Sequence, residues 1–167
     1  MEEYQIFRLV YVYDPLCGWC FGFHSNLVKL IEEYGHEFAF QSFVGGLIVG
    51  DRVATLDISY PAIKESVGVV EKRTSVQFGE GFRTNVLTNM DSYIMDSLPL
   101  SKAHILLRAH DPSRQTEIIG ALHNYIYRDG KPLDDLAELS GLAEQFGMDK
   151  ELITCLLYTS PSPTRPY

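Results

Sequence analysis

The sequence predicts an α/β protein in which a strand–helix–strand unit comes first and a long helical region follows. Residues 7–13, FRLVYVY, form a nearly continuous run of β-branched and aromatic residues that ends at Asp14-Pro15, which is typical of a strand buried on both faces. Residues 37–44, EFAFQSFV, alternate like a second strand before the Gly45-Gly46 break. No further convincing strand pattern follows for about a hundred residues.

An amphipathic helix is predicted between the two strands. From about Gly18, apolar residues recur at helical spacing, namely Cys20, Phe23, Leu27, Leu30, Ile31 and Tyr34. A strand, a helix and a second strand at this spacing form a right-handed βαβ unit, because crossovers of the other hand are very rare. We assign residues 1–50 to this unit.

Four helical patterns follow the βαβ unit. Each begins near a residue with a capping side chain: Ser59 ahead of Pro61, Ser97 ahead of Pro99, Asp111 ahead of Pro112, and Asp134 or Asp135 ahead of Leu136. Such side chains accept N–H bonds at helix starts, and proline is tolerated in the first turn. Residues 51–156 are therefore predicted to form an all-helical domain.

The last residues break this pattern. Proline, serine and threonine dominate the sequence LLYTSPSPTRPY, and no apolar face is visible. The segment resembles translated vector or adapter DNA, and a natural flexible tail is the alternative. We expect residues 157–167 to be an irregular tail outside the fold.

Length, composition and charge exclude several classes of protein. A chain of 167 residues can bury a core without disulfide staples, and 46% hydrophobic with 22% charged residues is not the composition of a disordered chain. The net charge of −8 argues against nucleic acid or an anionic membrane as partner, because both need a basic surface. Small molecules or proteins remain as partners.

The sequence also predicts a cytoplasmic protein. The N-terminus MEEYQIFRLVYVY lacks the charge pattern, apolar stretch and cleavage site of a secretory signal. No run approaches the length of about 18 apolar residues that a membrane span needs. In a reducing compartment, a close cysteine pair is more often catalytic or metal-binding than a static crosslink.

Cys17 and Cys20, in the sequence C-G-W-C, are the candidate catalytic residues. Cys17 follows the first strand and stands where the helix begins, so the helix dipole and free N–H groups should lower its pKa and make it nucleophilic. Cys20 lies one turn later on the same face and should be more covered. We expect Cys17 to attack a disulfide and Cys20 to resolve the mixed disulfide, leaving the pair oxidised. Trp19, Phe21 and Phe23 are either core or a surface for the substrate.

A zinc site is the main alternative for the cysteine pair. Structural zinc needs four ligands, and no second C-x-x-C or H-x-x-x-H is present. The histidines, His24, His36, His104, His110 and His123, are dispersed and are expected to be packed or exposed rather than ligands. The glycines at 45–50 lack the lysine and the following helix of a phosphate loop. We expect no metal and no bound cofactor.

The run DPLCGWCFGF at 14–23, the G-G-L loop at 45–47 and the helices that follow resemble the DsbA-like thiol–disulfide oxidoreductases, in particular the cytosolic predicted disulfide isomerases. The resemblance covers about residues 7–153. It implies a thioredoxin-like fold with a helical insertion, Cys17 as attacking thiol and Cys20 as its buried partner. It also implies protein or small-molecule thiols and disulfides as partners, glutathione among them.

The chain departs from that family after the insertion. The family continues with a loop bearing a cis-proline that faces the cysteines, then two strands and a closing helix, and we find none of these, so we expect the C-terminal part of the thioredoxin-like sheet to be missing. Two other functions remain open. One is that of the kappa-class glutathione transferases and hydroxychromene-carboxylate isomerases, which usually carry serine at the active position. The other is an inactive fragment or interaction module.

Overall fold

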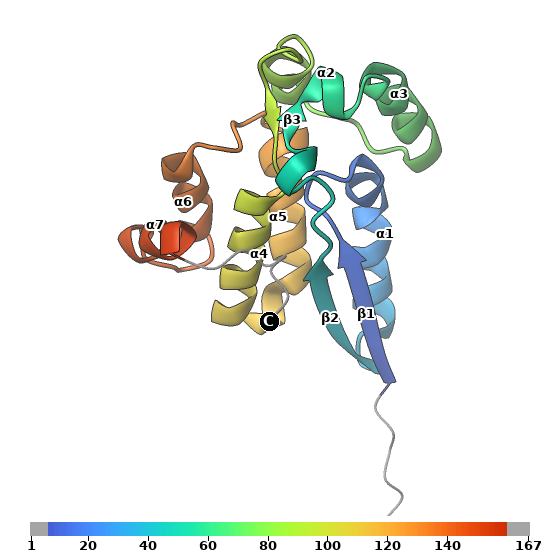
Figure 1. Cartoon of the computed structure of the whole chain (residues 1–167). Coiled ribbons are helices and arrows are strands. Elements are labelled where there is room, and N and C mark those ends of the chain that lie inside the picture. The colour runs from blue at the N-terminus through green and yellow to red at the C-terminus, as the bar shows by residue number, and fades with distance from the viewer. Residues whose placement is uncertain (1–6, 160–167) are drawn as a thin grey trace, which may run out of the picture.

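The computed structural model describes residues 7–159. It begins with β1 (Phe7–Tyr13), α1 (Gly18–Tyr34) and β2 (Phe38–Val44). The two strands pair in parallel, with Phe7 opposite Phe38 and Tyr13 opposite Val44. The βαβ unit predicted from the sequence is therefore confirmed (Figure 1).

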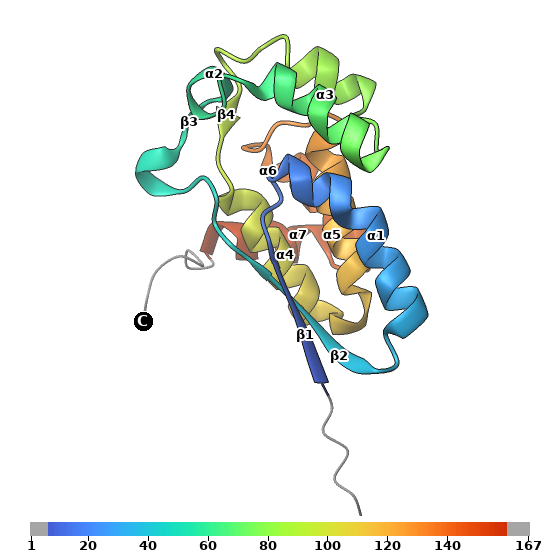
Figure 2. The ribbon, with the colours of Figure 1, turned by 90° about the vertical axis from the view of Figure 1, so that its right-hand side faces the viewer.

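The described residues cover only one face of this two-stranded sheet. Figure 2 shows α1, α4 (Leu98–His110) and α5 (Gln115–Tyr127) on the same side of β1 and β2. On that side Tyr13 packs with Leu27 of α1 and Ile119 of α5. On the other face, Val12 is 62% exposed. The prediction that the first strand is buried on both faces is wrong for this part of the chain, because its apolar run meets packing partners on one face alone.

The rest of the described chain is mainly helical. Its elements are, in order, η1 (Gly50–Arg52), β3 (Ala54–Thr55), α2 (Leu56–Ser59), α3 (Ile63–Thr74), the π-helical turn η2 (Phe82–Val86), β4 (Ile94–Met95), α4, η3 (Pro112–Arg114), α5, α6 (Leu136–Glu144) and α7 (Lys150–Thr159). β3 and β4 pair antiparallel. This ladder was not predicted, because a strand of two residues is too short to show an alternating pattern.

The predicted capping residues do not all cap. Asp135 accepts the N–H groups of Ala137 and Glu138 at the start of α6, as its sequence position suggested. Ser97 occupies the cap position of α4 but forms no side-chain cap. Its hydroxyl instead donates to the carboxylate of Asp14, at 2.9 Å. The local pattern found the helix start correctly and missed this long-range bond.

One hydrophobic core joins the βαβ unit to the helical region. Leu16 and Phe21, from either side of the cysteine pair, are buried with Val70, Phe82 and Ile126. Each fully buried side chain of this kind contributes about 1.5–3 kcal/mol. The core crosses the boundary placed at residue 51, and the division into domains at that position stays a prediction.

The end of the described chain differs from the expectation of an irregular tail from residue 157. Helix α7 runs through Thr159, and Leu157 is buried in the core. The expectation is therefore wrong for residues 157–159, because the apolar spacing of α7 continues past the point where proline and serine begin to dominate. Residues 160–167, the rest of the expected tail, lie outside the described residues.

Candidate active site

Cys17 occupies the N-cap position of α1. Its backbone is extended (φ −88°, ψ 103°), and its N–H donates to the carbonyl of Asp14 at 3.0 Å. Its sulfur accepts the N–H of Cys20 at 3.3 Å. The sulfur therefore replaces the oxygen of an ordinary capping residue and lies at the positive end of the helix dipole.

These contacts stabilise the Cys17 thiolate. The hydrogen bond from the Cys20 thiol is the main cause that lowers the pKa of Cys17 to about 7. Burial opposes it, the N–H groups of Cys20 and Trp19 add to it, and the negative charge of Asp14 opposes it least. A thiol with this pKa is about half ionised at pH 7 and is also a good nucleophile there.

Cys20 has the opposite electrostatics. Its pKa is raised well above its usual range, first by its hydrogen bond to the Cys17 sulfur and then by burial. The hydroxyl of Tyr11 also hydrogen-bonds Cys20 and favours its thiolate. Both cysteines are half-buried, so the expected difference in exposure is not seen. Hydrogen bonding, rather than burial, separates the two thiols.

The Asp14 carboxylate forms hydrogen bonds with three separate segments of the chain. Its buried carboxylate accepts the N–H of Leu16 at 2.9 Å, the N–H of Leu47 at 2.7 Å and the hydroxyl of Ser97 at 2.9 Å. These donors come from the loop before α1, the glycine loop after β2 and the start of α4. The carboxylate thus fixes the loop that carries Cys17 relative to the helical region.

A pocket of about 230 Å³ opens beside Cys17. Gly18, Trp19 and Leu47 line it together with Cys17, and α2, α3, η2 and β4 supply much of the remaining wall. The buried Tyr127 of α5 also lines it. The thiol is therefore placed at an apolar recess rather than on an open surface.

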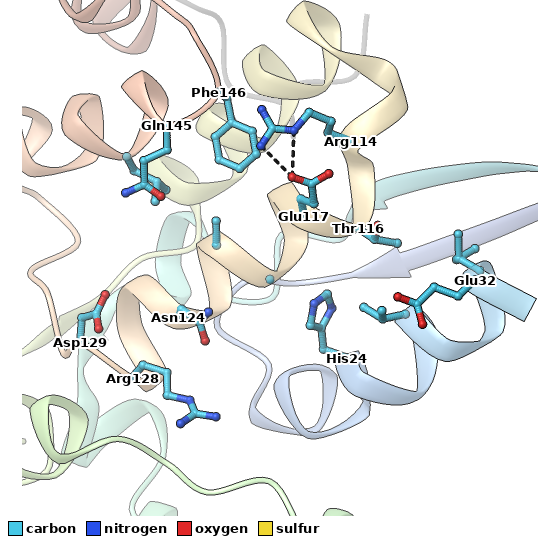
Figure 3. A pocket seen from close by; sticks show the side chains of 15 residues that line it. His24, Glu32, Arg114, Thr116, Glu117, Asn124, Arg128, Asp129, Gln145 and Phe146 are labelled. Atoms are coloured by element: carbon cyan, nitrogen blue, oxygen red, sulfur yellow. Dashed lines mark hydrogen bonds and ion pairs between the residues drawn. The ribbon is translucent and has the colours of Figure 1, made fainter. Parts of the chain in front are cut away.

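A second, larger cavity of about 990 Å³ lies between α1, α5 and the end of α6. Figure 3 shows that it holds charged side chains of both signs, including the ion pair of Arg114 with Glu117, which are 2.7 Å apart. The Arg114 guanidinium also lies over the ring of Phe146. Neither Cys17 nor Cys20 lines this cavity. We therefore place the candidate chemistry at the smaller pocket.

Two buried histidines, His104 and His123, pack against Tyr13. The Tyr13 hydroxyl bonds Nδ1 of His104 at 2.9 Å, and its ring packs edge-on against the rings of His104 and His123. Burial lowers the pKa of His104 to about 4 and that of His123 to about 3. His24 is half-buried, and its Nδ1 has no hydrogen-bond partner among the described residues, so it is neither exposed nor satisfied as expected.

Within residues 7–159, no group of three or more His, Cys, Asp or Glu side chains is placed to hold a metal ion. His36 and His110 are exposed and distant in sequence from the cysteine pair. No helix of the same part of the chain is long and apolar enough to cross a membrane.

Sequence reasoning did not assign several residues of this site. The sequence pattern places Asp14 at the end of a strand and Tyr11 within it. Tyr60 and Tyr127 come from segments far from the cysteines in sequence, and both line the pocket beside Cys17. A charged residue at the carboxyl end of a mostly apolar strand is a usable signal for Asp14, whereas nothing local marks the tyrosines.

No family model and no curated protein matches this chain. Several solved structures are similar to it in fold. A candidate protein disulfide isomerase from Nitrosomonas europaea has a TM-score of 0.77 at 21% identity, over 93% of this chain and 72% of that one. The cytosolic disulfide reductase DsbM from Pseudomonas aeruginosa has a TM-score of 0.74 at 22% identity, over 90% and 69%. The chain has a DsbA-like fold.

This result confirms the thioredoxin-like fold with a helical insertion that the resemblance implied. The DsbM reductase has also been solved with glutathione. A 2-hydroxychromene-2-carboxylate isomerase has a TM-score of 0.62 at 14% identity, over 92% of this chain and 72% of that one. Since one fold hosts different chemistries, activity must be argued from the site.

Proposed function

We propose that the chain is a thiol–disulfide oxidoreductase of the protein disulfide reductase or isomerase type. The observation that carries the proposal is the position of Cys17 at the N-cap of α1, where the thiol and N–H of Cys20 stabilise its thiolate. A cysteine in such an electropositive, half-buried position is the form expected of a reactive thiol. The similarity in fold to a disulfide reductase supports the same conclusion.

The reaction proceeds in two exchange steps. The Cys17 thiolate attacks one sulfur of the substrate disulfide, forms a mixed disulfide and releases the other sulfur as a thiolate. Cys20 then loses its proton to solvent and attacks the Cys17 sulfur, which releases the second substrate thiolate and leaves a Cys17–Cys20 disulfide. Two electrons pass from the protein to the substrate, and a dithiol reductant returns the pair to its reduced form.

Tyr11 assists the second step. Cys20 must become a thiolate to resolve the mixed disulfide, and its raised pKa opposes this. Once Cys17 is bonded to substrate, the hydrogen bond between the two thiols no longer exists, and the Tyr11 hydroxyl remains as a donor to the Cys20 sulfur. A hydrogen bond to an ionised group is worth about 1.5–3 kcal/mol, so Tyr11 stabilises the resolving thiolate.

The partners that fit this chemistry are thiols and disulfides of proteins or small molecules. Glutathione is included, because the similar reductase has been solved with it. The chemistry also fits the cytoplasm, where thiols are kept reduced and where that reductase is described as acting.

An isomerase or transferase that uses glutathione is the second candidate. The fold similarity to 2-hydroxychromene-2-carboxylate isomerase favours it. The presence of two hydrogen-bonded cysteines favours dithiol chemistry instead, because conjugation or isomerisation with glutathione needs no resolving thiol. An inactive fragment would show neither activity.

Insulin reduction with dithiothreitol tests the proposal. We expect the purified chain to accelerate the reaction, the Cys17→Ser variant to lose all acceleration, and the Cys155→Ser variant to keep it, since Cys155 is exposed on α7. Alkylation by iodoacetamide should show a midpoint near pH 7 for Cys17, and this midpoint should rise in Cys20→Ala. Activity that survives Cys17→Ser refutes the mechanism, and glutathione conjugation in its place supports the second candidate.

A further inference from the structure

We propose that the pocket beside Cys17 binds an uncharged apolar side chain next to the reacting sulfur of the substrate, so that disulfides flanked by aliphatic or aromatic residues are preferred. This inference rests on the proposed function and adds its substrate class. Cys17 itself lines the pocket, so a group seated there is adjacent to the sulfur under attack.

The chemistry of the pocket wall selects for an apolar group. Aliphatic side chains from α2 and α3 and the rings of Phe78 and Phe82 supply most of the surface. No Lys, Arg, Asp or Glu of the described chain lines it. Its polar side-chain groups are the Cys17 sulfur, the indole N–H of Trp19 and the hydroxyls of Ser66, Tyr60 and Tyr127. Burial raises the pKa of both tyrosines, so they stay neutral. A carboxylate in the pocket would lose its hydration, find no cation to pair with, and approach the Cys17 thiolate.

The size of the pocket fits a single side chain. Its volume is about 230 Å³, and a dry apolar cavity of about 150 Å³ is enough to bind benzene. A leucine or phenylalanine side chain therefore fits, whereas a folded segment of peptide backbone does not. The pocket then binds the side chain of the residue next to the substrate's reacting cysteine, and the rest of the substrate stays outside.

A backbone hydrogen bond fixes part of the pocket wall before substrate arrives. Leu47, which lines the pocket, donates its N–H to the buried Asp14 carboxylate at 2.7 Å, and this bond fixes the glycine loop. Trp19, which also lines the pocket, is 52% exposed. A site fixed in advance loses less binding energy to ordering. Trp19 is also the sole tryptophan in the sequence, so its fluorescence reports on this pocket alone.

Fluorescence measures binding without catalysis. The Cys17→Ser variant is titrated with three blocked tripeptides, Leu-Ser-Leu, Ala-Ser-Ala and Glu-Ser-Glu, which contain no thiol. We expect the Leu peptide to change Trp19 emission at about tenfold lower concentration than the Ala peptide, because an apolar pocket discriminates by about this factor. Equal midpoints for the three peptides overturn the inference, whether or not the chain is an enzyme.

Kinetics test the same preference in the active chain. The substrates are the disulfide-linked dimers of Leu-Cys-Leu, Ala-Cys-Ala and Glu-Cys-Glu, with hydroxyethyl disulfide as a probe without flanking residues. We expect kcat/KM to be about tenfold higher for the Leu dimer than for the Ala dimer. Equal values overturn the inference while leaving the proposed function intact. Hydroxyethyl disulfide reduction no faster than with Cys17→Ser overturns the proposed function.

A matched pair of variants places the effect in the pocket. Ser66 is exposed at the rim and lies on α3, so Ser66→Glu adds a carboxylate there without entering the core. Val69→Glu adds the same charge at an exposed position of the same helix that does not line the pocket. We expect the preference for the Leu dimer to fall in Ser66→Glu and to persist in Val69→Glu. Loss of the preference in both variants, with native circular dichroism, overturns the assignment to this pocket.

Discussion

Replacing Asp14 by asparagine should destabilise the fold and lower the pKa of Cys17 at the same time. In the native chain the carboxylate accepts two bonds at Oδ1, from Leu16 and Ser97, and one at Oδ2, from Leu47. An asparagine amide keeps the Oδ1 acceptor but turns an NH₂ group toward the N–H of Leu47. One bond to an ionised acceptor is lost, at about 1.5–3 kcal/mol, and a buried donor is left unpaired. We expect the free energy of unfolding to fall by about 3 kcal/mol.

Asp14→Asn should also make the Cys17 thiol more acidic, which favours the reactive thiolate at neutral pH although the fold is less stable. The Cys20 thiol is the main cause of the low pKa of Cys17, and the Asp14 charge is an opposing contribution that raises it. Removing that charge should move the alkylation midpoint of Cys17 to lower pH. The variant is therefore expected to be less stable and to hold a more acidic thiol.

Urea unfolding and alkylation as a function of pH measure the two effects separately. Asp51→Asn is the matched control, because Asp51 is exposed on η1 and the substitution changes the net charge by the same amount. We expect this control to leave both quantities close to wild type. A stability of Asp14→Asn within about 0.5 kcal/mol of wild type, the usual range for surface changes, refutes the bonding argument. An alkylation midpoint that rises refutes the electrostatic argument.

Two further predictions concern the interior. Burial lowers the pKa of His123 to about 3, and neither ring nitrogen has a hydrogen-bond partner within residues 7–159. Between about pH 6.5 and 3 the unfolded chain therefore binds a proton at this histidine that the folded chain does not. His123→Leu should raise the free energy of unfolding at pH 7 by about 1–3 kcal/mol and reduce the loss of stability between pH 6.5 and 4. Urea unfolding measures both effects, with the exposed His110→Leu as control. A loss of stability between pH 6.5 and 4 equal to that of the wild type would contradict this. Gly22 of α1 faces Thr74 and Val70 so closely that an added Cβ would lie 2.8 Å from a Thr74 methyl, so Gly22→Ala should destabilise by about 1–3 kcal/mol. Gly68→Ala, with open space around it, should stabilise α3 by up to about 1 kcal/mol, and equal thermal shifts of the two variants would refute the packing argument.

The parts of the fold that follow from local pattern were predictable. The continuous β-branched run, the helical spacing after Gly18 and the alternation in residues 38–44 each describe one element, and each element is present. The start of α6 followed from Asp135, whose carboxylate caps the N–H groups ahead of it. In these cases the information lies within a few residues of the structure it determines.

The features that depend on distant partners were not predictable from one sequence. Whether Val12 is buried depends on what lies across the sheet, which its own pattern does not state. Ser97 has the sequence position of a helix cap, yet its hydroxyl bonds a carboxylate 83 residues away. For the same reason Cys17 and Cys20 could be proposed as a pair from their spacing, while Tyr11, Tyr60 and Tyr127 could not be placed beside them.

Different segments of the chain supply the reactive thiol and the pocket beside it. The groups that set the reactivity of Cys17 come from the loop after β1 and the first turn of α1, all within residues 14–20. The walls of the adjacent pocket come mostly from segments between residues 56 and 95, in the helical region. Asp14 accepts hydrogen bonds from both Leu47 and Ser97, so it fixes the loop that carries Cys17 relative to the helical region. Substitutions in the pocket wall should therefore change which disulfide is chosen with little effect on the pKa of Cys17, whereas substitutions at Asp14 should affect both.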